Sequence, residues 1–359
     1  MFQKGLKGIV AVQTAIASVD GDKGELRYRG ELVKDAMEGK NFEQMAYFLW
    51  HGRHASAKEL ANLTEQFISY RQLPDYLLSI AQILPTEISL MDGMRTLVSA
   101  YQHGEFKELN SQEQAIALTA ALPVMAALLY RKSIGLEFVA PKSELGHTAN
   151  YLWMIKGQIP TAAQTEALET YVNLTMEHGM NASTFAGRVT ISTESDLCAA
   201  IVSALGTMKG PLHGGAPSGV LELLDDIQSP ENIRPVIEQK LAKGEKIMGF
   251  GHRVYRTEDP RALLLREKCQ QLQQEDPWLN LAVLAESEIT ELLNAQKPGR
   301  ALHTNVEFYA AAIMRSIQMP PELFTPSFSI ARIVGWSAHA LEQQRDNVIF
   351  RPQSEYIGT

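Results

Sequence analysis

Apolar residues recur at helical spacing along most of this sequence, and only a short region near its start has the character of β-structure. Residues 8–20 are rich in β-branched and small apolar residues, residues 21–24 form a glycine-bounded turn, and residues 25–29 can pair back as a short strand. From residue 42 onward, the spacing is typical of helices that bury one face. Strands do not alternate regularly with helices, which disfavours a Rossmann or barrel architecture. The sequence therefore predicts an all-α, mostly helical fold with a small β-hairpin near the N-terminus.

Side chains that cap helices mark several helix boundaries. Thr161 can cap a helix that runs to His178. Thr193 with Asp196 resembles a capping box ahead of an apolar run of small residues, 197–205. A helix this apolar on all sides is usually buried inside a fold or in a subunit interface.

Two further segments are predicted as helices from their composition. The longest apolar stretch runs from Ala115 to Tyr130 and has 16 residues. A membrane span requires about 18 to 20 apolar residues, so this stretch is predicted to be a buried core helix. Asp259 and Pro260 are typical of the N-cap and first position of a helix, here one running to Gln274.

Composition narrows the class of protein. The 359 residues include 33 basic and 41 acidic side chains, a net charge of −8, which is unlike a non-specific nucleic-acid binder. Cys198 and Cys269 lie far apart and form no CxxC pair, so we expect two reduced core thiols and no zinc module. The N-terminal residues lack a secretory signal pattern. We expect a cytoplasmic protein that holds no metal and binds neither nucleic acid nor membrane.

Polar residues in glycine-rich breaks between helices are the candidates for chemistry, because loops on a rigid scaffold carry sites. His178 follows a predicted helix, where it can serve a site or merely cap the helix end. His213 stands between Leu212 and two glycines, which allow a ligand to approach the backbone closely. Residues 249–261 (GFGHRVYRTEDPR) contain His252 and three arginines, a pattern that suits anionic ligands or a solvated basic loop.

An acid and a buried arginine complete the set of candidates. Glu307 lies in an apolar frame, where it is either a base or an ordinary helix acid, and Arg332 lies in an apolar helix where an unpaired charge would be costly. Histidines, one acid and several arginines suggest chemistry on an anionic carbonyl substrate. The acid would take a proton from carbon, one histidine would stabilise the enolate oxygen, and another would polarise the electrophile.

The 249–261 motif resembles the signature of the citrate synthase family. The resemblance continues in order over nearly the whole chain, in the segments SVDGDKGELRYRG (18–30), NASTF (181–185), KGPLHGGA (209–216), FTPSFSIAR (324–332) and EQQ (342–344) with RP (351–352). Motifs this long, found in this order, are highly specific. The chain is most similar to the short bacterial citrate synthases.

The resemblance implies a role for individual residues of this chain. His213 matches the histidine that stabilises the enol of acetyl-CoA, and His252 matches the one that donates to the keto oxygen of oxaloacetate. Glu307 stands where the family's carboxylate base removes the methyl proton. The other matches are oxaloacetate or citrate contacts (His178, His252, Arg261, Arg332 and Arg351) and CoA contacts (Arg256, Met248, Gly249, Phe250, Gly251 and Asn305).

The resemblance also implies a two-domain organisation. A large helical domain, residues 1–214 and 318–359, would form the dimer interface and hold the oxaloacetate site. A small domain, residues 215–317, would hold the CoA site and the catalytic acid. The active site would lie in the cleft between them, and closure of this cleft would exclude water from the enol. The length of the chain suits two domains, and the resemblance implies that the two are interleaved along the sequence.

Partners follow from the same resemblance. Arg351 matches an arginine that reaches into the neighbouring subunit's site, so we expect an obligate homodimer. The N-terminal region of hexameric, NADH-regulated relatives is not found, so we expect insensitivity to NADH. Acetyl-CoA and CoA act as substrate and product, and no separate cofactor is expected.

Two positions depart from the family pattern. The family base is usually Asp, and Glu307 is longer by one carbon–carbon bond, roughly 1.5 Å. Misplacing a catalytic group by about 1 Å can cost on the order of 100-fold in rate. The sequence therefore indicates either a slow enzyme or a site whose backbone has shifted to compensate. Pro217 stands where many relatives have a different residue, and it is expected to alter the helix entry or the domain hinge.

Two alternatives to a citrate synthase stay open. A 2-methylcitrate synthase would use propionyl-CoA, and a single methylene changes binding by only about 1 to 3 kcal/mol. A catalytically weak CoA- or dicarboxylate-binding regulator would retain the fold, and the Glu307 substitution is its main support. A serine hydrolase is disfavoured because the chain lacks a GxSxG motif.

Overall fold

The computed structural model describes residues 2–6, 8–214, 216–252, 254–272, 277–296 and 302–358, with the backbone alone at 216–218 and 277. Four points of the sequence interpretation lie outside these residues: the side chain of Pro217, Arg253 in the basic motif, the helix end at Gln274 and the domain boundary at residue 215.

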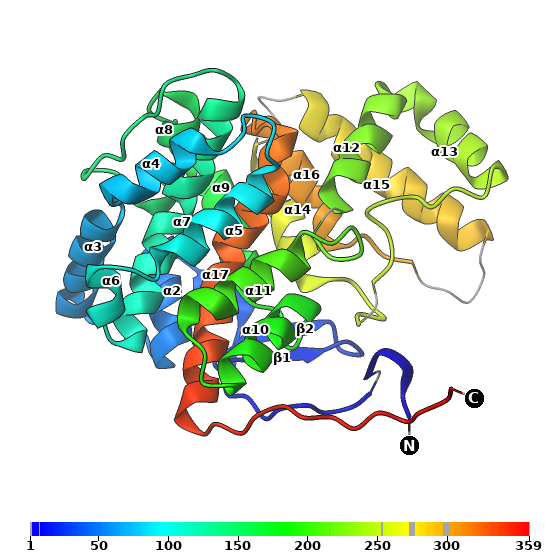
Figure 1. The fold of residues 1–359 in the computed structure, drawn as a ribbon. Helices are drawn as coiled ribbons and strands as arrows, with labels where there is room; N and C mark the ends of the chain where they lie inside the picture. Colours follow the sequence, from blue (N-terminus) through cyan, green and yellow to red (C-terminus); the bar gives the residue numbers. More distant parts are fainter. Residues whose placement is uncertain are drawn as a thin grey trace.

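Helices make up most of the described chain (Figure 1). They are α1 (Val33–Met37), α2 (Phe42–His51), α3 (Ala57–Tyr70), α4 (Asp75–Ile83), α5 (Leu90–Tyr101), α6 (Glu105–Glu108), α7 (Ser111–Ser133), α8 (His147–Lys156), α9 (Ala162–Thr175), α10 (Ala182–Ser192), α11 (Leu197–Met208), α12 (Ala216–Ile227), α13 (Ile233–Ala242), α14 (Pro260–Leu272), α15 (Pro277–Gln296), α16 (Val306–Ser316) and α17 (Phe324–Arg345). Short 3-10 turns occur at Lys4–Leu6, Pro230–Asn232 and Pro321–Leu323. The prediction of a mostly helical fold is confirmed.

The N-terminal β-element is an antiparallel sheet of β1 (Ala17–Asp20), β2 (Glu25–Tyr28) and β3 (Glu31–Leu32). The hairpin is confirmed, with Asp20 paired to Glu25 across the predicted turn. The first strand is shorter than predicted because residues 8–16 find no partner strand among the described residues. This segment instead runs along the C-terminal end of the chain, where the Ala15 N–H donates to Glu342 Oε1 at 2.9 Å (Figure 1).

Helix α7 is the apolar helix predicted for the core. Within the described part of the chain it is the one helix long and apolar enough to cross a membrane, but 78% of its most apolar window is buried inside the fold. It packs against α3, α5, α8 and α17. Its apolar surface is therefore used in the protein core.

The end of α9 differs from the prediction. Thr161 does cap the helix and forms a capping box with Gln164, but the helix ends at Thr175 rather than at His178. The reason is Tyr28 on β2, whose hydroxyl lies 3.0 Å from the Glu177 carbonyl oxygen and accepts from the Glu177 N–H at 3.3 Å. These contacts take backbone groups that a continuing helix would use. His178 is thereby released into a loop, so it is not a C-terminal cap.

The start of α11 also differs. Asp196 is the N-cap itself, with its side chain accepting from the Ala199 N–H at 2.8 Å, and Thr193 is the C-cap of α10. The predicted capping box of Thr193 with Asp196 is therefore wrong, because Thr193 ends α10 and Asp196 begins α11. The predicted start of α14 at Pro260 is confirmed.

Two groups of helices meet along α9, α14, α16 and α17. In Figure 1, α12, α13 and α15 lie on one side of the molecule, and α3, α4, α6 and α8 lie on the other. Helices α14 and α16 pack against each other and also against α9, while α17 packs against α7, α9, α10 and α11. The two-domain division stays a prediction, but most of the predicted site residues lie where these groups meet.

Candidate active site

A cavity of about 500 Å³ lies between the loops that follow α9 and α11, the loop that precedes α14, and helices α16 and α17. Its lining includes most of the residues singled out from the sequence: His178, His213, Met248, Gly251, His252, Arg261, Asn305, Glu307 and Arg332. Gly249, Phe250, Arg256 and Arg351 are not part of this lining.

The loop that carries His252 is fixed by pairing with the segment before α16. The Gly251 N–H donates to His303 O at 2.8 Å, and the Asn305 N–H donates to Gly249 O at 2.9 Å. Gly249 and Gly251 have φ angles of 87° and 83°, which favour glycine. A Cβ on Gly249 would also lie 2.9 Å from the ring of Phe308. The glycines of the motif therefore let the loop cross the start of α16 closely.

The protonation of His252 is determined by its neighbours. Its Nδ1 accepts from the backbone N–H groups of Val254 and Tyr255, both at 3.0 Å, so the ring proton is on Nε2. Burial lowers the pKa of His252 to about 4, and the charge of Arg261 acts in the same direction. Nε2 lies 3.4 Å from Nη2 of Arg261. Two donors that face each other are arranged to share one acceptor oxygen from a ligand.

Arg261 is held by a buried carboxylate. Asp259 accepts from Arg261 through both oxygens, at 3.0 Å from Nε and 2.8 Å from Nη2. Its Oδ2 also accepts from the Val306 N–H at 3.2 Å, which ties the start of α14 to the start of α16. Burial alone would raise the pKa of Asp259, but the charge of Arg261 holds it below its usual value. Asp259 thus does more than cap a helix.

His178 and Arg332 line the wall formed by α9 and α17. His178 Nε2 lies 3.0 Å from the hydroxyl of Tyr255, and burial, with the charge of Arg261, holds the pKa of His178 well below its usual value. Among the described residues, Arg332 donates one hydrogen bond, from Nε to Thr175 O at 2.7 Å, and its guanidinium stacks on Phe328. No carboxylate occupies its terminal nitrogens in this part of the chain, so they are available to an anionic ligand.

His213 is oriented by a serine. Its Nε2 lies 2.8 Å from Ser183 Oγ, which also accepts from the Trp336 indole N–H at 3.0 Å. The serine proton can point to Asn181 Oδ1, 2.8 Å away, or to His213. In the second arrangement the ring proton of His213 is on Nδ1. Burial lowers the pKa of His213 to about 4, so the ring is neutral at physiological pH.

Glu307 lies in the first turn of α16 and lines the cavity. Its backbone N–H donates to the side chain of Asn305 at 3.1 Å, and Asn305 Nδ2 donates to Gly251 O at 3.0 Å. Burial raises the pKa of Glu307, and the positive charge of Arg261 only partly opposes this shift. A carboxylate with a raised pKa is a stronger base, as proton abstraction from carbon requires.

Four predicted residues lie away from this cavity. Gly249 and Phe250 belong to the loop itself, and the Phe250 ring centroid lies 5.3 Å from that of Phe308. The Arg256 side chain is 81% exposed and pairs with Asp22 at 3.3 Å. Arg351 is exposed in the C-terminal tail, on a separate groove of about 950 Å³ between that tail and the N-terminal segment. A role for Arg351 in the cavity of its own chain is therefore not supported by its position.

Three residues of the site were not assigned a role from the sequence: Ser183, Tyr255 and Asp259. Ser183 and Tyr255 occur within motifs that carry the resemblance, and this position is the feature of the sequence that could have assigned them to the site. Asp259 was interpreted only as a helix cap. The pairing of each with a histidine or arginine becomes visible only in the folded chain.

The assembled groups can act on an anionic carbonyl compound. The neutral rings of His252 and His213 can each donate an N–H to a developing oxyanion. The buried arginines Arg261 and Arg332 can hold carboxylates. A carboxylate of raised basicity faces the same space. Within the described residues no group of three or more His, Cys, Asp or Glu side chains could hold a metal ion, and both Cys198 and Cys269 are buried.

Comparisons with known proteins show to which family the chain is similar. The family model for the citrate synthase C-terminal domain matches residues 5–353. The chain is 35% identical to the citrate synthase of Haloferax volcanii, over 99% of this chain and 96% of the relative. It is 36% identical to a 2-methylcitrate synthase of Mycobacterium tuberculosis, over 99% and 91%.

A solved structure has the same fold over the same length. The Thermoplasma acidophilum citrate synthase, in a ternary complex with carboxymethyl coenzyme A and oxaloacetate, superposes with a TM-score of 0.92 at 27% identity, covering 100% of this chain and 97% of that chain. Both the sequence relatives and the structure therefore match the chain from end to end, and this protein belongs to the citrate synthase family of condensing acyltransferases.

Proposed function

We propose that the protein is a citrate synthase, which condenses acetyl-CoA with oxaloacetate and hydrolyses citryl-CoA to citrate and CoA. The observation that carries this proposal is the convergence of three histidines, two buried arginines and one carboxylate of raised pKa on a single cavity. A relative of the same fold is known with a CoA analogue and oxaloacetate bound. The exposed C-terminal tail, which carries Arg351, supports a homodimer in which this arginine reaches the partner subunit.

Each group has a defined part in the proposed reaction. Glu307 removes a methyl proton from acetyl-CoA, and His213 donates from Nδ1 to the enol oxygen once Ser183 donates to its Nε2. The enol carbon attacks the keto carbon of oxaloacetate, and His252 gives its Nε2 proton to the oxygen that becomes the citrate hydroxyl. The proton that Glu307 took from the methyl group is then released to solvent, and solvent returns a proton to His252, so that both groups regain their starting states. Water then cleaves the thioester of citryl-CoA, which releases citrate and CoA.

The anionic groups of both substrates have basic partners. Arg261 and Arg332 hold the carboxylates of oxaloacetate with His178, through charge-assisted hydrogen bonds. The backbone from Met248 to Gly251, with Asn305, faces the CoA, and the exposed Arg256 approaches its phosphates. Arg256 would leave Asp22 to do so, which costs little for a solvated pair.

Relative kcat/KM for acetyl-CoA and propionyl-CoA, each with oxaloacetate, tests the proposal. A preference for acetyl-CoA supports a citrate synthase, and a preference for propionyl-CoA identifies a 2-methylcitrate synthase, the second candidate that the M. tuberculosis relative favours. No release of CoA from either thioester at high enzyme concentration would contradict both and favour a regulator.

The Glu307→Asp variant should be about 100-fold slower in kcat, because the acid becomes shorter by roughly 1.5 Å. The backbone cannot follow, since the Glu307 N–H is bound to Asn305 and Asn305 to Gly251. Steady-state kinetics at saturating substrates give the answer. A rise in kcat would show instead that the site is built for Asp, and an unchanged kcat would show that the length of the acid is unimportant.

The Gly21→Ala variant should lose at least about tenfold in kcat/KM, because the turn between β1 and β2 supports the His252 loop. The Arg256 N–H donates to Gly21 O at 2.9 Å, and a Cβ on Gly21 would lie 2.1 Å from Val254 O. Val254 N–H is one of the two groups that set the proton on His252. Gly146→Ala is the control, since its Cβ meets nothing closer than 3.7 Å. Equal kinetics for both variants would contradict a role for the turn.

Arg351 should act across the dimer interface. When an Arg351→Ala variant and a Glu307→Gln variant, each nearly inactive, are mixed in equal amounts and re-associated, the mixture should regain up to about a quarter of the wild-type activity, because about half of the dimers are heterodimers and one of the two sites in each is intact. Light scattering should show a dimer at assay concentration. A monomer with full activity, or no recovery on mixing, would overturn this part of the proposal.

A further inference from the structure

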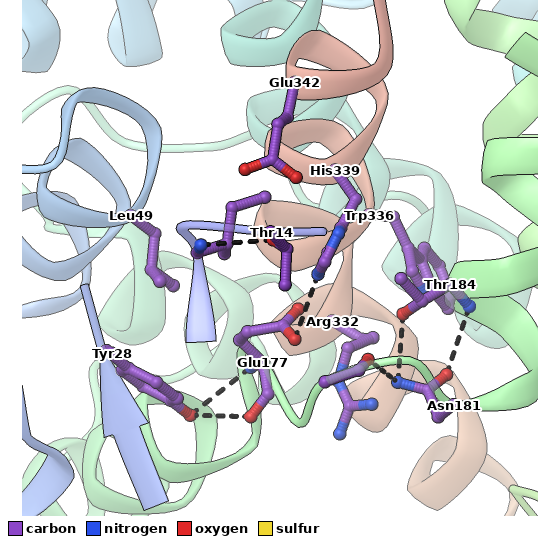
Figure 2. A network of polar contacts seen from close by, with 12 residues as sticks. Thr14, Tyr28, Leu49, Glu177, Asn181, Thr184, Arg332, Trp336, His339 and Glu342 are labelled. Carbon is purple, nitrogen blue, oxygen red and sulfur yellow. Dashed lines mark hydrogen bonds and ion pairs between the residues drawn. The ribbon is translucent and has the colours of Figure 1, made fainter. Parts of the chain in front are cut away.

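A buried network of polar side chains that the proposed mechanism does not use leads from the surface to the wall of the cavity. It consists of Glu177, His339, Arg188 and Glu342, and Figure 2 shows the first two beside Arg332. Glu177 and His339 are fully buried, and Arg188 is 3% exposed. Glu177 immediately precedes His178, so the inner end of this network lies next to His178 and Arg332 of the proposed dicarboxylate site.

Arg188 determines which atoms of this network donate and which accept hydrogen bonds. An arginine can only donate, and Arg188 donates to His339 Nδ1 from Nε at 3.0 Å and from Nη2 at 2.8 Å. The proton of His339 is therefore on Nε2, which lies 3.1 Å from Glu177 Oε1. Arg188 is itself bound to Glu342 and to Gln343. His339 is thus a fixed donor to Glu177.

The carboxylate of Glu177 lies over the face of α17 that carries Arg332. Arg332, Gly335 and His339 are three and four residues apart, so they share one face of the helix. A Cβ on Gly335 would lie 2.4 Å from Glu177 Oε2, which shows how closely the carboxylate rests on this face. Oε2 has no hydrogen-bond partner among the described residues. The negative charge is therefore near Arg332 and yet does not bind its terminal nitrogens.

We propose that Glu177 is a positioning residue that balances the charge of Arg332 from a distance, and that His339 restrains it there so that the guanidinium stays open to a substrate carboxylate. Arg332 is 1% exposed and would be uncompensated without a nearby anion. Burial lowers the pKa of Arg332, and the charge of Glu177 opposes this shift. The inference rests on the proposed function, in which Arg332 binds a carboxylate of oxaloacetate.

Glu177→Gln keeps the acceptor for His339 and removes the charge. The free protein should be less stable, since Arg332 loses its counter-charge, but oxaloacetate should bind about tenfold tighter, because its carboxylate then supplies the only compensation. A residue with a merely structural role would lower stability without tightening the ligand. Calorimetric titration with oxaloacetate and the melting temperature of the free protein measure the two effects.

His339→Phe should act in the opposite direction on binding. It removes the restraint, so Glu177 can pair with the terminal nitrogens of Arg332 and compete with the ligand, which weakens oxaloacetate binding by about tenfold. The double variant should bind as tightly as Glu177→Gln, because the restraint matters only while the charge is present. His339→Gln, which keeps a donor, should restore binding close to wild type.

Glu43→Gln is the matched control. Glu43 is also a buried carboxylate, 3.5 Å from Arg71, and it is not part of the cavity lining. Its variant should lower the melting temperature and leave the oxaloacetate affinity unchanged. Unchanged or weaker binding by Glu177→Gln, while the wild type binds normally, would overturn the inference. Absence of binding by the wild type would instead overturn the proposed function.

Discussion

Glu307→Gln should lower kcat by a factor of about 10² to 10⁴ and leave substrate affinity nearly unchanged. Glutamine keeps the length of the side chain and one of its two oxygens but cannot accept a proton from carbon, and general-base catalysis contributes an effect of this size. Arg261, Arg332 and the three histidines stay in place because none of them forms a hydrogen bond to the Glu307 side chain among the described residues. Rapid-quench turnover and calorimetric binding of oxaloacetate separate the two effects.

The pH profile gives a second measure of the same group. Burial raises the pKa of Glu307, so kcat/KM in the wild type should fall as pH decreases through this raised value, while the exposed control Glu322→Gln keeps the wild-type profile. His213 and His252 have pKa values of about 4 and do not produce a limb near neutrality. The limb should be absent from the residual activity of Glu307→Gln. Retention of the limb would assign it to another group.

Arg261→Met should both destabilise the protein and abolish binding of oxaloacetate. Asp259 is 1% exposed and accepts from Arg261 through both oxygens, so the variant leaves a buried, unpaired carboxylate. Breaking one side of a buried pair costs about 3–5 kcal/mol, which lowers the melting temperature on the order of 5–10 °C in a domain of this size. Scanning calorimetry measures the first effect and titration with oxaloacetate the second.

A double variant separates stability from binding. Asp259→Asn with Arg261→Met removes the unpaired charge, and the asparagine oxygen can still accept from the Val306 N–H. Stability should return to within about 1–2 kcal/mol of the wild type, since replacing both partners is nearly neutral. Binding should not return. Recovery of oxaloacetate binding in the double variant would show that Arg261 acts only through its pairing with Asp259.

The elements that the sequence predicted correctly depend on neighbouring residues. The hairpin has its turn glycines beside both strands, α9 starts at a threonine three residues before its glutamine, and α7 is apolar along its own length. Each of these signals lies within a short stretch of sequence, so it can be recognised without knowledge of the fold. The end of α9 was missed because the hydroxyl that terminates it comes from Tyr28, 149 residues away from Glu177 in the chain.

The individual residues of the site could be predicted from the sequence, but their partners could not, because these come from distant parts of the chain. Histidines and arginines beside glycines are recognisable one at a time, but their protonation depends on partners from other elements. Ser183 meets His213 across 30 residues, and His339 meets Glu177 across 162. Arg256 lies in the motif beside His252 but its side chain points to solvent, a difference that a linear pattern does not contain.

The hydroxyl of Tyr28 has a consequence for laboratory evolution of this enzyme. Tyr28 is not part of the cavity lining, yet it ends α9 and so releases the loop from which His178 enters the cavity. A mutant library confined to the residues that line the cavity would not include Tyr28. Selection for altered acyl-donor range should therefore include the first strands of the chain, where loss of the Tyr28 hydroxyl is expected to change the position of His178.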